Sequence, residues 1–570
     1  MPEPDQQNLN FIWATHFVRS LYSSGISEAV ISPGSRSTAL TLAFAAHPGF
    51  RKHVIIDERS AAFTALGLAK ASGKPAVLVC TSGTAVANYY PAVIEATQSG
   101  IPLIVASADR PPVLRGNGAS QTIDQLKIFG DYPVYFHDTG LPVDDPQSVL
   151  RLELSAKQAV RASLFNHGVA HINLPFEKPF EPYTDLIAAT EEENKLQQPG
   201  SVHEYALSET ELEADELFWS DLTAATKPLI VCGPRISLEE NNGLIQKLAN
   251  VLNAPIIAEA GSLVPDSEHS IPFTDGFLKN EQTVEKLSPD LILRFGAEPV
   301  SNALNNYLKH HSSVTQIRFS SDGELRDQTQ SATKHLHLYG NLRIPAIKGA
   351  ANEDWINSWK NYSSEYEEFL TAQISPEIPL ADGDVFSAIL PDIPEDSFVM
   401  LSNSFPVRDF GLFGRSKTHE IYVNRGAAGI DGIISTTFGL SLHLQKRGFL
   451  FIGDIAFLHD SNALLNSNSI TSPLHIILLN NGGGSIFRML PVHTLGEEYF
   501  QYFDTPQDVS VAALCRAHKV DHTLISRPNQ LEQIFRYTLD EPGVHVYEFI
   551  TEADESMELR KKLWNSNPSN

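Results

Sequence analysis

Two loops in the last quarter of the chain carry residue types that could hold a divalent cation. Residues 453–455 (Gly-Asp-Ile) and residues 481–484 (Asn-Gly-Gly-Gly) each follow a short apolar run. If both runs are parallel strands of one sheet, Asp454 and Asn481 can converge on one ion at its carboxyl edge. Oxygen donors suit Mg²⁺, which commonly bridges to substrate phosphates, and glycines let backbone groups approach the same ion. Taken singly, each loop also fits a simpler explanation, an Asp that caps a helix or a flexible Asn-Gly turn.

The elements that would position these loops are short apolar runs alternating with helical stretches, the pattern of parallel α/β sheets. The runs are continuously apolar, as expected of parallel strands buried on both faces. They form three blocks, so we predict an α/β protein of three doubly wound, mostly parallel-sheet domains. The predicted domains are residues 1–180, 204–345 and 384–570, joined by polar segments at 178–203 and about 340–383. The predicted strands are Ala29–Ile31, Val54–Ile56, Ala76–Cys80, Leu103–Ser107 and His171–Leu174, then Leu229–Cys232, Ile256–Ala258, Leu291–Phe295, Val314–Phe319 and His335–Leu338, then Phe398–Leu401, Ile421–Val423, Phe449–Ile452, His475–Leu479 and Val544–Phe549.

The composition excludes several classes of function. The 570 residues include 68 acidic and 42 basic ones, and the formal net charge of -26 repels phosphate backbones, which argues against a nucleic-acid partner. We find no apolar run long enough for a bilayer span and no signal-peptide pattern, so we expect a cytoplasmic protein without a membrane partner. Cys80, Cys232 and Cys515 are far apart in sequence, and we expect reduced, mostly buried thiols. The sequence has no HExxH or GxSxG motif, so nothing in it indicates a zinc or serine hydrolase. No GxGxxG follows a strand of the first block, which argues against a Rossmann dehydrogenase.

The two glycine-bearing loops together resemble the metal–diphosphate signature of thiamine-diphosphate (ThDP) enzymes. That signature is Gly-Asp-Gly followed by Asn about 25 residues later, and here Ile455 stands where the second Gly is usual. The resemblance implies ThDP as cofactor, with Gly453 beside it. It also implies Mg²⁺ or Mn²⁺ held by Asp454, Asn481 and Gly483. The cofactor of such enzymes supplies carbanion chemistry, while the protein supplies orientation and charge complementarity.

Further segments are similar to one family within these enzymes, the 2-succinyl-5-enolpyruvyl-6-hydroxy-3-cyclohexene-1-carboxylate (SEPHCHC) synthases of menaquinone biosynthesis. The resemblance covers the first and third blocks almost throughout and is thin across the second. It implies decarboxylation of 2-oxoglutarate and addition of the resulting succinyl-semialdehyde carbanion to isochorismate, in a homodimer or homotetramer. The segments that carry it are 32–38 (Ser-Pro-Gly-Ser-Arg-Ser-Thr), 81–88 (Thr-Ser-Gly-Thr-Ala-Val-Ala-Asn), 108–112 (Ala-Asp-Arg-Pro-Pro), 424–432 (Asn-Arg-Gly-Ala-Ala-Gly-Ile-Asp-Gly) and 485–487 (Ser-Ile-Phe).

The same resemblance assigns roles to single residues. Glu58 matches the catalytic acid that hydrogen-bonds the cofactor pyrimidine at N1′, although an acid that opens a helix is also favoured by the helix dipole. Ile430 matches the apolar residue beneath the bent cofactor, and Ile486 and Phe487 match residues that wall the site. Because both substrates are dicarboxylates, several Arg should bind them through the planar guanidinium. The residues that match substrate-binding positions are Ser35, Arg36, Arg110, Gln121, Arg408 and Arg425.

One position departs from the family pattern. Asn302, in the loop 296–302 after the predicted strand Leu291–Phe295, stands where the family ordinarily carries a Lys that reaches an isochorismate carboxylate. The loss of that charge should weaken the local site unless another base, such as Arg294 or Lys309, substitutes for it. Equally, Asn302 could cap a helix at 303–308, since Asn is a good N-cap residue.

Two alternatives to the SEPHCHC synthase reading stay open at this point. One is another ThDP enzyme, either a 2-oxo-acid decarboxylase or an acetolactate-synthase-like ligase. Its substrates would be less anionic, so the four matched Arg argue against it. The other is a catalytically silent binding protein of the same fold, which would have no reason to keep Glu58, Asp454 and Asn481 together.

Overall fold

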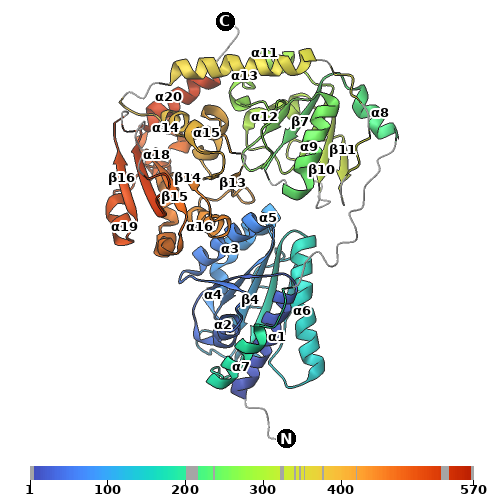
Figure 1. Ribbon diagram of the computed structural model, residues 1–570. Coiled ribbons are helices and arrows are strands. Elements are labelled where there is room, and N and C mark those ends of the chain that lie inside the picture. Colours follow the sequence, from blue (N-terminus) through green and yellow to red (C-terminus); the bar gives the residue numbers. More distant parts are fainter. Residues whose placement is uncertain are drawn as a thin grey trace. The chain divides into compact units, whose positions relative to one another are not determined.

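The computed structural model describes residues 6–199, 216–234, 238–320, 326–338, 342–345, 348–351, 353–374, 378–418, 420–527, 530 and 538–565. These residues form three sheets of parallel strands with helices on their faces (Figure 1), which confirms the predicted α/β class. The contacts divide the chain into two compact units. Unit 1 comprises Met1–Ala206, Asn424–Gln445 and His459–Ser469, and unit 2 comprises Leu207–Val423, Lys446–Leu458 and Ile470–Asn570.

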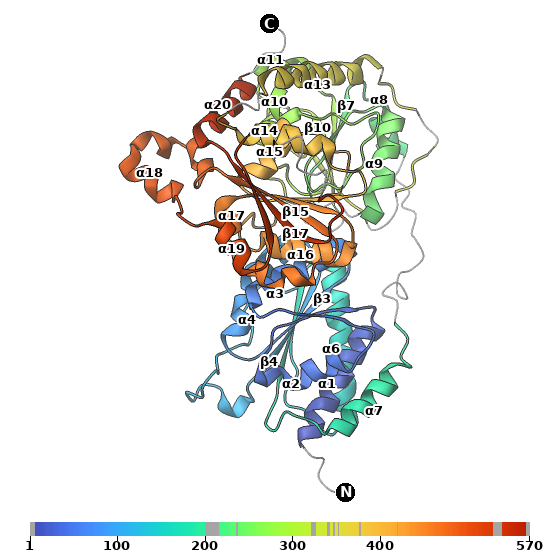
Figure 2. The same cartoon turned by 60° about the vertical axis from the view of Figure 1, so that its left-hand side comes forward.

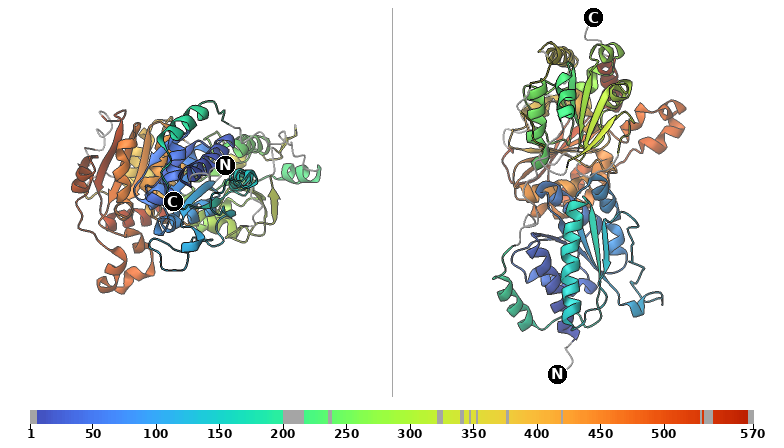
Figure 3. Two further views of the ribbon diagram at one scale, coloured as in Figure 1. Left: turned by 90° about the horizontal axis from the view of Figure 1, so that it is seen from below. Right: turned by 90° about the vertical axis from the view of Figure 1, so that its right-hand side faces the viewer.

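The sheet of unit 1 has the strand order β2-β1-β3-β4-β6-β5. Its winding changes direction between β1 and β3, the place where open α/β sheets bind ligands. Helices α1, α2 and α6 bury one face, and Figure 3 shows α6 lying along the sheet; α3 and α5 cover the other face. The bounds are β1 Glu28–Ile31, β2 Arg51–Val54, β3 Ala76–Cys80, β4 Leu103–Asp109, β5 Tyr135–Asp138, β6 Val169–Pro175, α1 Gln6–Ser23, α2 Thr38–Ala45, α3 Glu58–Ser72, α4 Thr84–Asn88, α5 Tyr90–Ser99, α6 Pro146–Phe165 and α7 Thr184–Asn194.

Helix α3 packs closely against α16 (Ile433–Leu444), a helix far away in sequence that also belongs to unit 1 (Figures 1 and 2). Glycines make this approach possible. A Cβ at Gly439 would lie 2.1 Å from the carbonyl oxygen of Thr64, and a Cβ at Gly67 would lie 2.0 Å from that of Thr436. The two helices therefore touch backbone to backbone.

The first sheet of unit 2 has the order β11-β10-β9-β7-β8. Helices α8 and α9 bury one face, and a second apolar core that includes α12 and α13 covers the other. The bounds are β7 Pro228–Cys232, β8 Ile256–Ala258, β9 Leu291–Phe295, β10 Thr315–Ser320, β11 Lys334–His337, α8 Glu216–Ala224, α9 Leu238–Leu252, α10 Thr274–Phe277, α11 Glu281–Lys286, α12 Asn302–His310 and α13 Glu353–Gln373.

The second sheet of unit 2 has the order β13-β12-β14-β15-β17-β16, and its winding changes direction between β12 and β14. Helices α14, α15 and α20 contribute to the apolar core on one of its faces, and Figure 2 shows α18 extending outward from this sheet. The bounds are β12 Phe398–Leu401, β13 Ile421–Val423, β14 Gly448–Gly453, β15 Pro473–Asn480, β16 Asp521–Ile525, β17 Gly543–Ile550, α14 Asp382–Ile389, α15 Phe405–Phe413, α17 Asp454–His459, α18 Glu497–Asp504, α19 Val511–Ala517 and α20 Ala553–Trp564.

The predicted elements differ from the observed ones mainly at sheet edges and in the polar segments. Strand β2 lies three residues earlier than predicted, and the edge strands β5 and β16 were not predicted. Helix α7 lies in the predicted connecting segment 178–203, and the 21-residue helix α13 lies in the segment 340–383. No described helix is long and apolar enough to span a membrane. The three cysteines are free and buried, as predicted.

Candidate active site

Asp454 and Asn481 leave the carboxyl ends of two neighbouring strands in unit 2. Strands β14 and β15 pair in parallel, with Gly453 opposite Leu479, so the loops that follow them start at the same edge of the sheet. Asp454 is the first residue of α17, and the β12/β14 switch point lies directly beside it. The predicted convergence of these two loops is therefore what the sheet topology produces.

The Asp454 carboxyl group lies in surroundings that favour a nearby cation. The residue is 7% exposed, and its Oδ1 accepts a hydrogen bond of 2.9 Å from the backbone N–H of Ile455. Burial raises the pKa of Asp454 to about 7, backbone hydrogen bonds from Ile455 and Gly483 oppose the rise, and the charge of Asp382 adds to it. A cation at this carboxylate would offset the cost of its ionisation.

Asn481 offers an unused oxygen to the same place. Its Oδ1 is buried and has no hydrogen-bond partner among the residues described here, while its Nδ2 donates to both carboxylate oxygens of Asp382, at 3.3 and 3.5 Å. Such an orphaned buried oxygen is rare unless a ligand completes it.

The backbone at Gly483 is confined as well. It has φ +153°, and a Cβ there would lie 2.4 Å from the carbonyl oxygen of Asp504. By contrast, a Cβ at Gly453 would meet nothing within 4 Å, so open space lies beside it. Together with Asp454 and Asn481, these glycines fit a hard cation and an associated diphosphate. Among the described residues no group of three or more His, Cys, Asp or Glu could hold a metal ion.

Ile486 and Phe487 follow this loop in a short 3-10 helix, Ser485–Met489. Both side chains are partly buried. The Phe487 ring lies 5.6 Å from the ring of Phe503, centroid to centroid, in an edge-on arrangement. This apolar pair is placed to form a wall close to the loop of Asn481 and Gly483.

Glu58 is the first residue of α3 in unit 1, directly after the N-cap residue Asp57, whose side chain accepts from Ser60 N–H at 3.2 Å. The residues on both sides of Glu58 form side-chain hydrogen bonds. Asn462 donates to Asp57 at 2.9 Å, and Arg59 donates to the carbonyl of His459 at 2.8 Å. The half-buried Glu58 carboxylate itself has no hydrogen-bond partner in the described part of the chain, so it is available to a ligand.

Three of the predicted substrate residues lie in loops that follow β1 and β4 of unit 1, two strands with β3 between them. Ser35 follows β1 and is exposed, and Arg110 follows β4. The Nε of Arg110 lies 3.5 Å from the backbone carbonyl of Gln121, which also accepts a hydrogen bond of 3.2 Å from the Ser82 hydroxyl after β3. Gln121 adopts φ +56°, a left-handed conformation that is held by these contacts. The structure therefore brings Arg110 and Gln121 together.

Arg36 has a different environment. It is 4% exposed, and its Nη1 donates to the carbonyl of Phe176 at 2.6 Å while its guanidinium lies 4.5 Å from the ring centroid of Phe180. These contacts anchor the loop after β1 to the segment after β6. A direct contact between Arg36 and substrate stays a prediction.

Arg425 and Ile430, both partly buried, lie in the loop 424–432 of unit 1. The buried Glu95 holds this loop, because its carboxylate accepts from the backbone N–H of Gly426 at 2.9 Å and of Ala427 at 2.7 Å. A cavity of about 210 Å³ lies beneath the loop, lined by Phe63, Pro91, Ile94, Glu95, Asn424, Ala427, Gly429 and Asp431. Sequence reasoning missed Glu95, although an acid within the otherwise uncharged stretch 89–99 was a signal.

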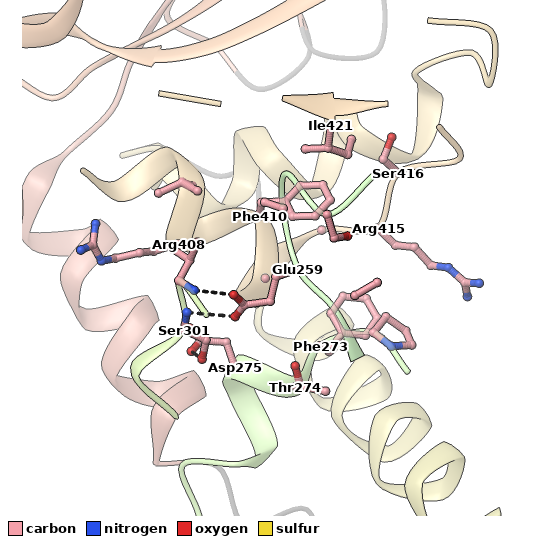
Figure 4. A pocket seen from close by; sticks show the side chains of 18 of the residues that line it. Glu259, Phe273, Thr274, Asp275, Ser301, Arg408, Phe410, Arg415, Ser416 and Ile421 are labelled. Atoms are coloured by element: carbon pink, nitrogen blue, oxygen red, sulfur yellow. Dashed lines mark hydrogen bonds between the residues drawn. The ribbon is translucent and has the colours of Figure 1, made fainter. Parts of the chain in front are cut away.

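A second cavity, of about 140 Å³, lies in unit 2 and includes Arg408 and Asn302 in its lining (Figure 4). Arg408 and Arg415 lie on opposite sides of it, and Lys279 is a third cation of its wall. Glu259 lies between them and accepts from the backbone N–H of Ser301 at 2.9 Å. The same wall carries three acids, Glu259, Asp266 and Asp275, and Arg415 pairs with Asp266 at 3.5 Å. The wall is therefore balanced in charge, and a carboxylate ligand would bind through Arg408 and Lys279 individually.

Asn302 does not cap its helix. The cap of α12 is Ser301, whose hydroxyl accepts from Leu304 N–H at 3.1 Å, and Asn302 is the first residue of the helix, so the expected capping role is wrong. Helix α12 begins at residue 302, one residue before the predicted 303–308, so the capping position falls on Ser301, a residue type that suits it as well as Asn. Arg294 cannot replace a missing Lys, since its guanidinium is buried and paired with Asp327 and Glu298.

The predicted site residues thus fall in both units. Ser35, Arg36, Glu58, Arg110, Gln121, Arg425 and Ile430 belong to unit 1, whereas Asn302, Arg408, Gly453, Asp454, Asn481, Gly483, Ile486 and Phe487 belong to unit 2. Sequence reasoning missed Asp382 and Lys279, because Asp382 lies in a segment taken as a connector and Lys279 follows no predicted strand.

Comparison with known proteins agrees with this geometry. Residues 13–128 match the N-terminal TPP-binding domain of thiamine pyrophosphate enzymes, and residues 412–549 match their C-terminal TPP-binding domain. The chain is 37% identical to the SEPHCHC synthase of Geobacillus kaustophilus, covering 97% of each chain. It is 35% identical to that of Bacillus velezensis, over 96% of this chain and 97% of the relative, and 34% identical to that of Chloroflexus aurantiacus, over 97% and 95%.

Proposed function

Because the chain belongs to the SEPHCHC synthase family of thiamine-diphosphate enzymes, we propose that it decarboxylates 2-oxoglutarate and joins the remaining four-carbon unit to isochorismate, releasing SEPHCHC and CO₂. The observation that carries the proposal is the pair formed by the buried Asp454 carboxyl group and the unpartnered Oδ1 of Asn481. This donor set fits a divalent cation and a diphosphate. When bound, thiamine diphosphate supplies the carbanion chemistry of the reaction.

The predicted site residues of unit 2 would hold the metal ion, the cofactor and one substrate. Asp454, the Oδ1 of Asn481 and the backbone of Gly483 hold Mg²⁺ or Mn²⁺, and the open space beside Gly453 leaves room for the diphosphate. Ile486 and Phe487 exclude water from one side. Arg408, with Lys279 on the same cavity, binds carboxylate groups and compensates for the missing Lys at position 302.

The residues of unit 1 supply the proton-transfer group and further substrate contacts. Glu58 holds a hydrogen bond at the pyrimidine N1′, which its unpartnered carboxylate is free to make. Ile430 supports the bent cofactor. Ser35, Arg110, Gln121 and Arg425 contact substrate, and Arg36 holds the loop of Ser35 in place.

The family architecture also gives a proposal for assembly. Glu58 of one subunit faces cofactor held by Asp454 and Asn481 of another, so the smallest active form is a homodimer, which a tetramer can contain. We place the enzyme in the cytoplasm and keep 1–180, 204–345 and 384–570 as the pyrimidine-binding, central and diphosphate-binding domains.

Incubation of the purified protein with 2-oxoglutarate, isochorismate, ThDP and Mg²⁺ tests the proposed function. We expect loss of isochorismate and formation of a product with the mass of SEPHCHC, both dependent on ThDP and absent in Asp454→Ala. Turnover of pyruvate in preference to 2-oxoglutarate would favour an acetolactate-synthase-like enzyme instead. Absence of any ThDP-dependent CO₂ release would leave the fold with a binding role only.

A further inference from the structure

A buried ionic cluster lies directly behind Asn481. Asp382 at the start of α14, Asp409 on α15 and Arg560 on α20 are 0%, 1% and 0% exposed. Arg560 donates to Asp409 at 2.8 Å through Nε and to Asp382 at 2.8 Å through Nη2. Burying three charges is costly and often no more stabilising than apolar packing.

The carboxylate of Asp382 is fixed on several sides. Its Oδ2 accepts from Arg560, its Oδ1 accepts from the Thr551 hydroxyl at 2.7 Å, and its backbone N–H donates to the Ser556 hydroxyl at 2.9 Å. Both oxygens can accept a further hydrogen bond, and Nδ2 of Asn481 lies 3.5 Å from Oδ1 and 3.3 Å from Oδ2. Asp382 therefore presents a rigid acceptor to the Asn481 amide.

The orientation of that amide follows from chemistry alone. An ionised carboxylate accepts hydrogen bonds and donates none, so only the NH₂ end of the Asn481 amide can face Asp382. The oxygen end must then point to the opposite side, where Oδ1 is buried without a partner in the described structure. Because Arg560 and Thr551 occupy the Asp382 oxygens, that carboxylate is also withheld from the ion.

We propose that Asp382, locked by Arg560 and Thr551, is a positioning residue that turns the amide oxygen of Asn481 toward the divalent cation. This inference rests on the proposed function, which places the cation at Asp454 and Asn481. Partners of metal ligands commonly set ligand orientation, and their loss costs about 10–100-fold in metal affinity. In Asp382→Asn the single amide oxygen must take the Oδ2 place, because Arg560 can only donate. The NH₂ then takes the Oδ1 place, opposes the NH₂ of Asn481 there and removes one of the two acceptors that orient that amide.

Direct metal binding tests the proposal without turnover. Mn²⁺ is titrated at saturating ThDP, and free Mn²⁺ is followed by electron paramagnetic resonance, for wild type, Asp382→Asn and Asp384→Asn. Asp384 is the matched control, because it lies on the same helix, is 4% exposed and accepts from the Ala381 N–H at 2.8 Å. We expect the Mn²⁺ Kd to rise about 10–100-fold in Asp382→Asn alone, while melting temperatures without metal and ThDP fall in both variants.

Equal Mn²⁺ affinity in the two variants would overturn the inference. If wild type binds Mn²⁺ and Asp454→Ala does not, that result leaves the proposed function standing. Wild-type protein that takes up no Mn²⁺ with ThDP would overturn the proposed function and this inference with it. Should Asp382→Asn not fold, Thr551→Val carries the test, and an unchanged Mn²⁺ Kd in that variant would equally reject the positioning role.

A reversed pair distinguishes positioning from general support. In the double variant Asp382→Asn/Asn481→Asp, the amide at 382 donates to the carboxylate at 481, whose second oxygen can face the ion. We expect this double variant to bind Mn²⁺ more tightly than Asp382→Asn alone. A merely structural role for Asp382 predicts no recovery, and no recovery would count against the proposal.

Discussion

Glu58 is surrounded by satisfied polar groups yet has no described partner of its own. We expect Glu58→Gln to fold and to bind ThDP while its kcat falls at least about 10²-fold, since an amide cannot exchange a proton with N1′. Steady-state kinetics and calorimetric titration of ThDP measure the two effects separately. Asp57→Asn is the matched control, because Asn retains the helix cap and should leave kcat near the wild-type value. Near wild-type turnover in Glu58→Gln would refute the assignment.

Arg408, which the sequence predicts to bind substrate, lines the cavity of unit 2. We expect Arg408→Ala to lower kcat/KM by about ten- to hundredfold, because a hydrogen bond to a charged group contributes about 1.5–3 kcal/mol. Separate KM values for 2-oxoglutarate and isochorismate identify the substrate that it binds. The control Arg516→Ala, an exposed residue on α19, should change neither value. Equal effects of both substitutions would indicate a general charge effect.

The residues of the candidate site were predictable where a strand end places them. Asp454, Asn481 and Arg110 follow buried apolar runs, and a parallel sheet turns that pattern into proximity. Asp382 was not predictable, because its partners Asn481 and Arg560 are 99 and 178 residues away and only the tertiary fold unites them. The cavity cations Lys279 and Arg415 likewise carry no local signal.

At the scale of elements, interior strands were predictable and edge elements were not. The β2 strand is an exposed edge whose residues lack the apolar run on which the prediction depended. Helix α13 buries Trp355, Trp359 and Tyr366, among others. Their spacing in the sequence is helical, but the charged residues of the opposite face make the segment polar on average and hide the pattern.

The contact between α3 and α16 gives a prediction of its own. We expect Gly439→Ala to destabilise the protein by about 1–3 kcal/mol or more, because the added methyl group would meet the Thr64 carbonyl, which helix geometry holds in place. Urea unfolding followed by circular dichroism measures the change. Gly243→Ala in α9 is the control, since a Cβ there meets nothing within 4 Å and should stabilise the helix. A tolerated Gly439→Ala would show that the two helices can separate at little cost.

A second prediction concerns the ionic link between β1 and α16. Burial alone would raise the pKa of Glu28, but hydrogen bonds with His443 and His53 and the charge of Arg51 lower it to about 2 from its ordinary 4.5. A lowered carboxyl pKa stabilises the fold above the ordinary value, and this contribution is lost as the pH falls through the folded value. Glu28→Gln should therefore reduce the melting temperature at neutral pH, and the gap from wild type should narrow as the pH falls from 4.5 toward 2.

The control for this effect is Glu192→Gln, since Glu192 is 74% exposed and its pairing with Lys195 should contribute little. Calorimetric melting curves across the acidic range provide the comparison. A gap between Glu28→Gln and wild type that stays constant with pH would contradict the ionic explanation.

At the scale of the whole molecule, the proposed dimer makes a quantitative prediction about mixed subunits. Glu58→Gln and Asp454→Ala homodimers should each be nearly inactive. After random exchange of equal amounts, half of the dimers contain one of each, and one of their two sites has both intact residues, so about a quarter of wild-type activity should return. Failure to recover activity, with subunit exchange confirmed by mass spectrometry, would place each site within one chain.

The division of unit 1 into Met1–Ala206, Asn424–Gln445 and His459–Ser469 also bears on how the protein is made. On the ribosome, the first of these segments emerges long before the residues that complete the unit. At roughly 5–20 residues per second, the interval is on the order of tens of seconds. During that time α16 is not yet available to pack on the glycine-bearing face of α3. The segment His459–Ser469, which forms hydrogen bonds with the two neighbours of Glu58, is also not yet synthesised. The nascent amino-terminal segment therefore exposes surface that is buried in the finished unit 1 and must avoid aggregation. Unit 1 can complete its folding only after residue 469 has been synthesised.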